Sequence, residues 1–493
     1  MWSMMLAAVL AVSWGSDREP KVLIIGVDGL LPAGLDAANA PSIRSLMRNG
    51  CWTMEASTDA YAISGAGWSN ILCGVWPDKH RSPDNSFRSM RYDLYPHVLR
   101  RLSDSRPDLT SASITSWGPL DEVMLGNVSP AIRVFHDYEK DDGDVNCTRA
   151  AVEAMGREDL DLMFLYYADV DTAGHTHGFS PFVPEYVAEI EEVDGMIGRV
   201  LSAMLARPTF AREDWLVILT TDHGGSLDKN HGKNEASNRQ IPFIVSGASA
   251  ARGRFLHTVN QVDVVATTLE HLGVRVDPAW GLDSVAVGKP RACEFGQNLI
   301  VNGGAEWSTA AEDQRSNAGV PGWKDWGSMT TLAYGGVEGG PKAESRGPVS
   351  RGRNYFCGGA AQRAEMEQAI DLRPRRGEIE AGGVEFEFSG WFGGYGEQRD
   401  LAYAEVVFAD ERGVELSRHR IGPVTLEDRI QTWACGAPAS PDSLTGLIDR
   451  TVRDGVPPDA RMAVVRIVCE AGEGLNDGYA DELSLVLAEG ATR

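Results

Sequence analysis

Short apolar runs alternate with segments of helical periodicity from Lys21 to about Gly273. The runs are rich in β-branched residues and are bounded by polar or turn residues, which is typical of strands buried on both faces of a parallel sheet. They are Val22–Val27, Ser111–Ser116, Leu162–Tyr167, Trp215–Leu219 and Ile241–Val245. The alternation predicts a doubly wound, mostly parallel α/β sheet with helices on both faces.

The segments between these runs carry apolar residues at roughly helical spacing. Pro41–Arg48 has a proline at its first turn and Gly50 beyond its end, which favours a helix with these limits. The other predicted helices are Asp93–Leu102, Asn146–Met155, Glu185–Leu205 and Val262–Leu272.

After about Gly288 the pattern changes to dense Gly and Pro with alternating apolar and polar positions. Such segments are Val384–Phe388, Ala402–Phe408 and Met462–Val468, and several short strands of this kind indicate a β-sandwich. A chain of 493 residues is too long for one hydrophobic core. We therefore expect a catalytic domain over residues 17–288 and a β-sandwich module over residues 297–493.

The formal net charge of −24 limits the choice of partner. An acidic surface repels nucleic-acid backbones and anionic lipid headgroups, so nucleic-acid polymers are not expected to bind. Bound divalent cations still make a single pocket locally positive. No stretch approaches the roughly 20 apolar residues that a transmembrane helix needs.

The N-terminus and the cysteines bear on the compartment. The apolar run Met4–Val12 and the small residues after it are typical of a signal peptide over residues 1–16, although no Lys or Arg precedes the run. We expect a secreted or periplasmic protein.

The seven cysteines form no CxxC motif, which disfavours a zinc ribbon. One or two disulfides are expected in the C-terminal half, with the pairing open among Cys293, Cys357, Cys435 and Cys469.

Three of the predicted strands run into an aspartate, namely Asp28, Asp171 and Asp222. The carboxyl ends of parallel strands meet at one edge of the sheet, where open α/β folds bind ligands. Three histidines follow at short spacing: His175, His223 and His231. Six nitrogen and oxygen ligands are too many for one tetrahedral ion and suit two divalent ions, zinc first and manganese or iron as alternatives. Read one by one, the same residues are turn, cap or structural residues, as we expect for His80, His97 and His177.

A nucleophile is expected in the glycine-rich segment around Ser64. A serine at a helix N-terminus lies where free N–H groups favour anions, and neighbouring glycines let the backbone approach a phosphate. Coordination to a metal ion lowers the pKa of such a hydroxyl. Ser69 competes for this role, and a capping residue is the alternative for Ser64 itself.

Several motifs occur together in one order: VLIIGVDG from Val22, SGAGWSNILCGVWPDKH from Ser64, DVDTAGHTHG from Asp169, TTDHGG from Thr220 and NHG from Asn230. Over residues 21–250 the chain resembles the alkaline phosphatase superfamily, in its type I phosphodiesterase or nucleotide pyrophosphatase-like branch. The resemblance implies an alkaline phosphatase-like fold and a phosphoseryl intermediate on Ser64. It also implies that Asn85 holds a non-bridging phosphate oxygen. The implied ligands are Asp28, Ser64, Asp222 and His223 for one metal, and Asp171, His175 and His231 for the other.

Departures from the family pattern bear on the substrate. Ser64-Gly65-Ala66 stands where nucleotide phosphodiesterases carry Thr, an aromatic residue and Pro, which leaves nucleotide specificity open. His231 follows His223 by only eight positions, which indicates a reduced cap and an open pocket. No Arg lies between Gly50 and His80 to hold a monoester, which favours diesters. A phosphomonoesterase and a phosphonate or sulfate ester hydrolase stay as alternatives, although Cys73-Gly74-Val75 does not fit the sulfatase motif.

The C-terminal half is similar to galactose-binding-like β-sandwich (jelly-roll) modules. The similarity rests on NLIVNGGAE from Asn298, Pro321–Trp323 and NDGYADELSLVL from Asn476. It suggests carbohydrate binding through stacking aromatic residues, with a place in the core as the alternative for each. A structural calcium ion at Asp477 and Asp481 is a further suggestion. The non-enzyme alternative is a carbohydrate-binding protein with an inactive hydrolase-like domain. The aromatic candidates are Trp391, Tyr395 and Trp433.

Overall fold

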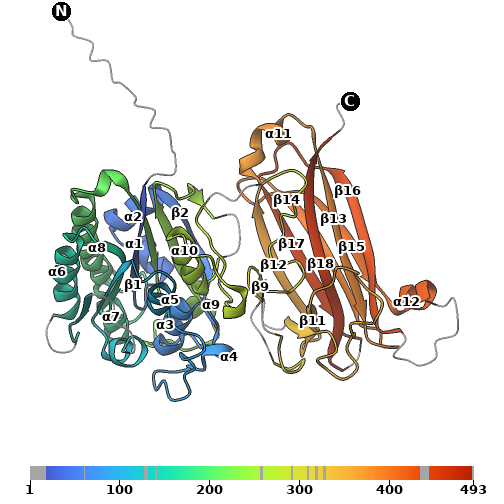
Figure 1. Cartoon of the computed structure of the whole chain (residues 1–493), viewed down its shortest axis with the longest axis horizontal. Helices are drawn as coiled ribbons and strands as arrows, with labels where there is room; N and C mark the ends of the chain where they lie inside the picture. The colour runs from blue at the N-terminus through green and yellow to red at the C-terminus, as the bar shows by residue number, and fades with distance from the viewer. Residues whose placement is uncertain are drawn as a thin grey trace, which may run out of the picture.

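The structure is a computed structural model of the chain. It describes residues 18–59, 61–126, 132–138, 142–255, 259–289, 293–307, 310–316, 320–325, 329–433, 444–472 and 474–490. An α/β domain and an all-β domain lie side by side (Figure 1). The predicted signal peptide and Cys435 lie outside the described residues and stay predictions.

The α/β domain contains an eight-stranded sheet in the order β4-β3-β5-β1-β6-β7-β2-β8. The strands are β1 (Glu19–Val27), β2 (Gly50–Ser57), β3 (Thr110–Thr115), β4 (Ile132–Phe135), β5 (Leu160–Tyr167), β6 (Glu213–Thr220), β7 (Gln240–Gly247) and β8 (Gly253–Arg254). The run from β4 to β6 is parallel, whereas β7 is antiparallel to both β6 and β2. The predicted mostly parallel fold is confirmed. The three strands that we did not predict are short or carry partly exposed positions without a continuous apolar run.

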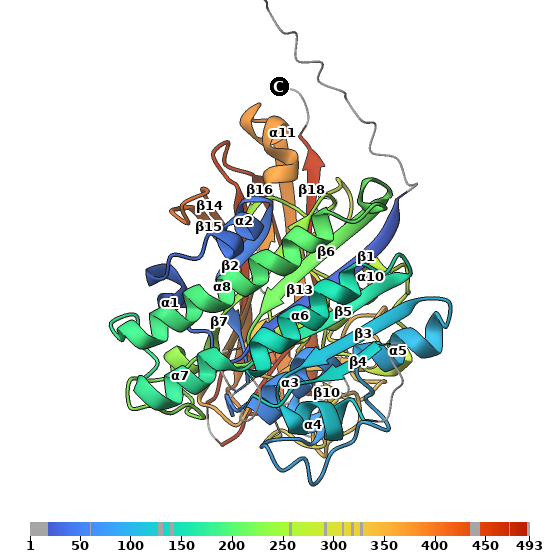
Figure 2. The same cartoon turned by 90° about the vertical axis from the view of Figure 1, so that its left-hand side faces the viewer.

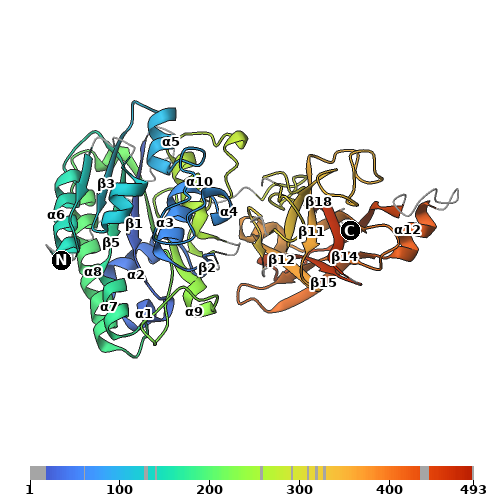
Figure 3. The same cartoon turned by 90° about the horizontal axis from the view of Figure 1, so that it is seen from below.

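Helices cover both faces of this sheet. They are α1 (Pro32–Ala37), α2 (Pro41–Arg48), α3 (Ser64–Cys73), α4 (Pro77–His80), α5 (Val98–Ser105), α6 (Gly143–Met155), α7 (Asp169–His177), α8 (Pro184–Leu205), α9 (Ala236–Arg239) and α10 (Val264–His271). Residues of α2, α6 and α8 share one core cluster with Leu23 and Ile25, and residues of α3, α5 and α10 share the other with Val22 and Ile24 (Figures 2 and 3). Alternate residues of β1 therefore face opposite helical layers.

The predicted helix Asp93–Leu102 is wrong at its start. Residue 95 precedes Pro96, which disfavours helical backbone there. His97 is the N-cap residue, and its side chain accepts a hydrogen bond from the Arg100 N–H, so that α5 begins at Val98.

The all-β domain contains two five-stranded sheets in the orders β10-β11-β18-β13-β16 and β15-β14-β17-β12-β9. The strands are β9 (Lys324–Asp325), β10 (Thr330–Ala333), β11 (Asn354–Gly359), β12 (Arg363–Asp371), β13 (Val384–Gly394), β14 (Leu401–Ala409), β15 (Glu415–Val424), β16 (Gly446–Gly455), β17 (Met462–Glu470) and β18 (Asn476–Glu489). Two short helices, α11 (Arg376–Glu380) and α12 (Leu426–Trp433), lie at its ends. Phe386, Phe408 and Val465 belong to one core between the sheets, which confirms the predicted sandwich.

Four of the residues suggested for sugar or calcium binding in the sandwich contact neighbouring side chains. Trp391 and Tyr395 are half-buried against a small aromatic cluster, and the side chain of Trp433 lies outside the described part of the chain. Asp477 accepts a hydrogen bond from the Tyr479 hydroxyl (2.8 Å), and Asp481 accepts one from Tyr334 (2.6 Å). Neither aspartate belongs to a group of three metal-binding side chains among the described residues.

The predicted disulfides do not form among the described cysteines. All six of them are free and buried, including Cys293, Cys357 and Cys469. Their thiols pack as small apolar groups in hydrophobic clusters. Within the described ranges no helix is both long and apolar enough to cross a bilayer.

We predict that Asp194→Ala destabilises the α/β domain. Asp194 of α8 is 2% exposed and accepts hydrogen bonds from the N–H groups of Ser42 (3.0 Å) and Ile43 (2.7 Å) at the start of α2. Loss of both acceptors should lower the free energy of unfolding by about 1–3 kcal/mol, measured by urea denaturation. Glu191→Ala is the control, because Glu191 accepts an exposed hydrogen bond from Asn39; an equal effect of both variants would contradict the prediction.

Candidate metal centre

The candidate ligands come from loops and helix starts at one edge of the sheet. Asp28 follows β1 directly, and Asp222 and His223 follow β6. The prediction that Asp171 ends a strand is wrong, because β5 ends at Tyr167 and Asp171 lies in the first turn of α7. His175 lies one helical turn later, so both side chains point to the same side of α7.

The first group of ligands is buried. His223 Nε2 lies 3.5 Å from Asp28 Oδ1 and 3.2 Å from Asp222 Oδ2. The Oγ atom of Ser64 lies 3.2 Å from the same nitrogen. Ser64 is 6% exposed and the three ligands are 2% exposed or less.

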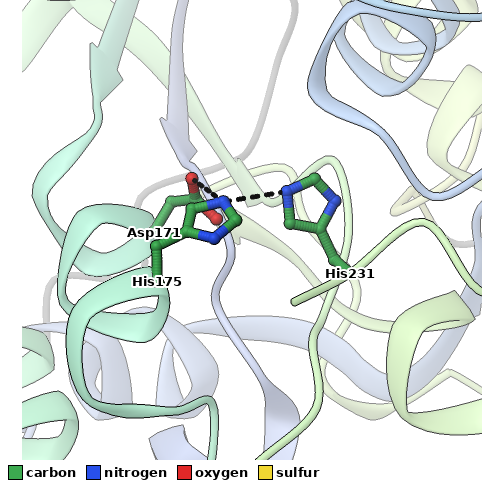
Figure 4. A group of neighbouring side chains, drawn as sticks. All are labelled: Asp171, His175 and His231. Carbon is green, nitrogen blue, oxygen red and sulfur yellow. Dashed lines mark hydrogen bonds and ion pairs between the residues drawn. The ribbon is translucent and has the colours of Figure 1, made fainter. Parts of the chain in front are cut away.

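The second group is open to solvent. His175 Nε2 lies 3.4 Å from Asp171 Oδ2 and 3.1 Å from His231 Nε2 (Figure 4). The side chain of His175 is 44% exposed and that of Asp171 is 18% exposed. The rings of His223 and His231 stack with their centroids 3.7 Å apart, so the two groups adjoin.

Backbone carbonyl groups orient all three imidazoles. The Nδ1 atoms of His175, His223 and His231 lie 3.0, 2.8 and 2.9 Å from the carbonyl oxygens of Lys229, Gly224 and Ala62. If each Nδ1–H donates to its carbonyl oxygen, each Nε2 keeps a lone pair that points to the neighbouring candidate ligands. Two such lone pairs 3.1 Å apart repel each other, and a cation between them removes this repulsion.

Each aspartate has one buried oxygen atom without a hydrogen-bond partner in the described part of the chain. Asp28 Oδ1, Asp171 Oδ1 and Asp222 Oδ2 are buried without a hydrogen-bond partner among the described residues. A buried carboxylate oxygen without a partner costs free energy, which coordination to a cation offsets. The donor set therefore fits two divalent cations, and oxygen with imidazole ligands suits zinc, manganese or iron.

Burial sets the protonation of these groups. It raises the pKa of Asp28, and it raises the pKa values of Asp171 and Asp222 well above their usual range, where neighbouring carboxylates add to the effect. Burial lowers the pKa of His223 and of His231 to about 3. The imidazoles of His223 and His231 are thus neutral at pH 7 and can act as metal ligands.

Ser64 and Asn85 lie together at the N-terminus of α3. Asn85 Oδ1 accepts a hydrogen bond from the Gly65 N–H (2.7 Å), which fixes the amide beside the serine. Ser69, the rival nucleophile, donates its hydroxyl hydrogen bond to the Gly65 carbonyl, and its Oγ lies 2.7 Å from the Tyr92 hydroxyl. The Ser69 hydroxyl is thus engaged in this network, whereas Ser64 Oγ lies 3.2 Å from His223 Nε2.

Sequence reasoning missed the residues that hold the aspartates. Trp68 Nε1 (2.9 Å) and the Tyr166 hydroxyl (2.7 Å) both donate to Asp28 Oδ2. Asp222 Oδ1 accepts from the Gly29 N–H (3.3 Å) and the Thr221 hydroxyl (3.2 Å). Buried aromatic residues in strands and helices look like core residues, so the sequence held no signal for this role.

A comparison with known families finds a match in the α/β domain. Residues 22–235 match the family of type I phosphodiesterases / nucleotide pyrophosphatases. Over these residues the α/β domain is similar to this family. Asp28, Ser64, Asp171, His175, His223 and the other candidate ligands all fall within the matched residues.

The curated proteins that match the α/β domain do so at low identity and over only part of their length. GPI ethanolamine phosphate transferase 1 of Aspergillus oryzae is 31% identical over 135 residues, which is 27% of this chain and 12% of the relative. Phosphopentomutase of Methylobacterium radiotolerans is 27% identical over 201 residues, covering 40% of this chain and 45% of the relative. The chain thus spans less than half the length of either relative.

Solved structures show a similar arrangement at low identity. Murine ectonucleotide pyrophosphatase / phosphodiesterase 5 is 14% identical with a TM-score of 0.43, over 52% of this chain and 96% of that chain. A 2-O GAG sulfatase is 11% identical with a TM-score of 0.46, over 71% and 83%.

We predict that Asp222→Asn removes about one metal ion per chain. An amide is a weaker ligand than a carboxylate, and the buried group then has only two strong ligands. Metal content is measured by elemental analysis of the dialysed protein. Asp228→Asn is the control, since Asp228 forms an exposed ion pair with Lys233; full metal content in Asp222→Asn would reject the assignment.

We predict that Tyr166→Phe weakens metal binding about 10- to 100-fold, because Asp28 loses one of the two donors that orient it. Competition with a chromophoric chelator measures the affinity. Tyr167→Phe is a matched control in the adjacent position, because the Tyr167 hydroxyl pairs with Thr148 Oγ1 (3.1 Å). Equal affinities of the two variants would show that the Tyr166 hydroxyl does not position Asp28.

Proposed function

We propose that this protein is a two-metal-dependent phosphodiesterase with Ser64 as its nucleophile. The observation that carries the proposal is the convergence of the Ser64 hydroxyl and two adjoining ligand groups in a domain similar to the phosphodiesterase family. Asp28, Asp222 and His223 with Ser64 would hold one cation. The second group, Asp171, His175 and His231, would hold the other.

The protein's own residues account for the order of steps. Ser64 Oγ gives its proton to solvent and attacks phosphorus, and the phosphorus–oxygen bond to the leaving group breaks as the bond to Ser64 forms. The released alkoxide takes up a proton from solvent. Water then attacks the phosphoseryl group and releases Ser64 and the phosphate product. Divalent cations supply charge stabilisation for the attacking and leaving oxygens when bound. The Asn85 amide donates to a non-bridging oxygen of the phosphate.

The preference for a diester rests on charge. The segment from Gly50 to His80 holds no arginine that would neutralise the second charge of a monoester. A phosphomonoesterase and a phosphonate or sulfate ester hydrolase are the enzyme alternatives. The other alternative is a carbohydrate-binding protein with an inactive hydrolase-like domain. Zinc as the resident metal, export through residues 1–16 and glycan binding by residues 297–493 belong to the same proposal.

Hydrolysis of bis-p-nitrophenyl phosphate and p-nitrophenyl phosphate, with chelator and with zinc restored, tests the function. We expect chelator-sensitive turnover that favours the diester. Ser64→Ala should lower this turnover at least about 10³-fold while metal content stays unchanged. Ser69→Ala is the control for changes within α3 and should keep the parent activity within tenfold. Turnover of neither ester with zinc restored would reject the phosphodiesterase.

A further inference from the structure

A cleft of 660 Å³ is lined by residues that lie two or three positions along the chain from Ser64, Asn85 and His231, and none of the candidate ligands lines it. Each loop that carries Ser64, Asn85 or His231 also supplies a wall of this cleft, through Tyr61, Pro83 and Asn234. Helices α4 and α9 and strand β9 lie at the junction of the two domains (Figure 1), and residues of all three line the cleft. A substituent on a phosphate held at Ser64 therefore has a place to bind.

The all-β domain forms the outer wall of the cleft. Val320, Trp323 and Lys324 line it from that side. Lys324 belongs to β9, whose pairing with Glu367 of β12 joins it to the sandwich. The α/β domain alone thus provides only part of the pocket.

Two arginines give the cleft a cationic character within an acidic protein. Arg81 follows α4 and is exposed, and Arg239 ends α9. Neither arginine forms an ion pair among the described residues. Arg239 donates to Asn234 Oδ1 (2.8 Å), and its buried Nε atom has no partner in the described part of the chain.

Two aspartates, Asp59 and Asp78, also line the cleft, against the two arginines and Lys324. Asp59 Oδ1 accepts hydrogen bonds from the N–H groups of Tyr61 (2.6 Å) and Ala62 (3.1 Å), and its other oxygen accepts one from Asn70. Its carboxylate is therefore engaged in holding the loop before Ser64. Asp78 is the second acid, and burial with the nearby Asp283 raises its pKa to about 6.

We propose that the cleft binds the second ester substituent of the substrate, and that this substituent carries its own anionic group, which Arg81 and Arg239 neutralise. The proposal rests on the phosphodiesterase function and names its substrate class. Tyr61 is 47% exposed and offers a flat apolar surface beside the guanidinium groups. Arginine is suited to phosphate or carboxylate oxygens because it donates in a fixed fork.

The test compares three p-nitrophenyl phosphodiesters whose second substituent is ethyl, 2-carboxyethyl or 2-phosphoethyl. We expect kcat/KM to be at least about tenfold higher for an anionic substituent than for ethyl. Arg81→Gln and Arg239→Gln should each remove most of this advantage, mainly by raising KM for the two anionic diesters, so that the kcat/KM values of the three diesters converge. Arg88→Gln is the control, since Arg88 is exposed in the same loop and does not line the cleft.

The outcomes separate the two proposals. A preference for 2-carboxyethyl or for 2-phosphoethyl identifies which anion the arginines recognise. Equal kcat/KM for all three diesters, or an advantage that survives Arg81→Gln combined with Arg239→Gln, overturns the anionic substituent and leaves the phosphodiesterase in place. Hydrolysis of none of the three by the metal-loaded protein overturns the phosphodiesterase. Calorimetric binding to Ser64→Ala gives the same comparison without turnover, and tighter binding of the anionic diesters is expected.

Discussion

Repulsion among three buried carboxylates is the constraint on which this site depends. Asp28, Asp171 and Asp222 converge at the sheet edge, and each has a buried oxygen without a hydrogen-bond partner among the described residues. Like charges in a poorly solvated site are unfavourable unless protons or cations compensate them. The neutral imidazoles of His223 and His231 add lone pairs and no compensating charge. The arrangement of these side chains is therefore suited to bind divalent cations.

The hydrophobic core extends directly to the candidate ligands around Asp28. Trp68 packs edge-on against Tyr166, with ring centroids 5.1 Å apart, and both rings direct their polar atoms to Asp28. Gly26 of β1 leaves room for the Trp68 ring, because a Cβ atom there would lie 2.4 Å from it. Core packing thus decides which oxygen of Asp28 faces the ligand group. A change in the core of α3 or β5 is expected to alter the metal site even without touching a ligand.

The two domains contribute differently to the proposed chemistry. Phosphorus chemistry needs only residues of the α/β domain, because all candidate ligands and Ser64 lie in it. Substrate recognition needs both domains in our proposal, because β9 closes the cleft in which Arg81 and Arg239 lie. Trp391 and Tyr395 pack against a small aromatic cluster of the sandwich, and glycan binding at these positions stays a proposal.

The sequence by itself determined the fold class and the chemical types of the ligands. Five apolar runs predicted the central strands, because burial on both faces requires continuous hydrophobic residues, and Asp28, Asp222 and His223 stand next to strand ends in the chain. The tertiary structure decided the rest. It placed Asp171 on α7, paired the Ser69 hydroxyl with that of Tyr92, brought Tyr166 to Asp28 across 138 positions and brought Lys324 to the cleft. Periodicity reports only on neighbours along the chain, whereas these contacts depend on how distant segments pack.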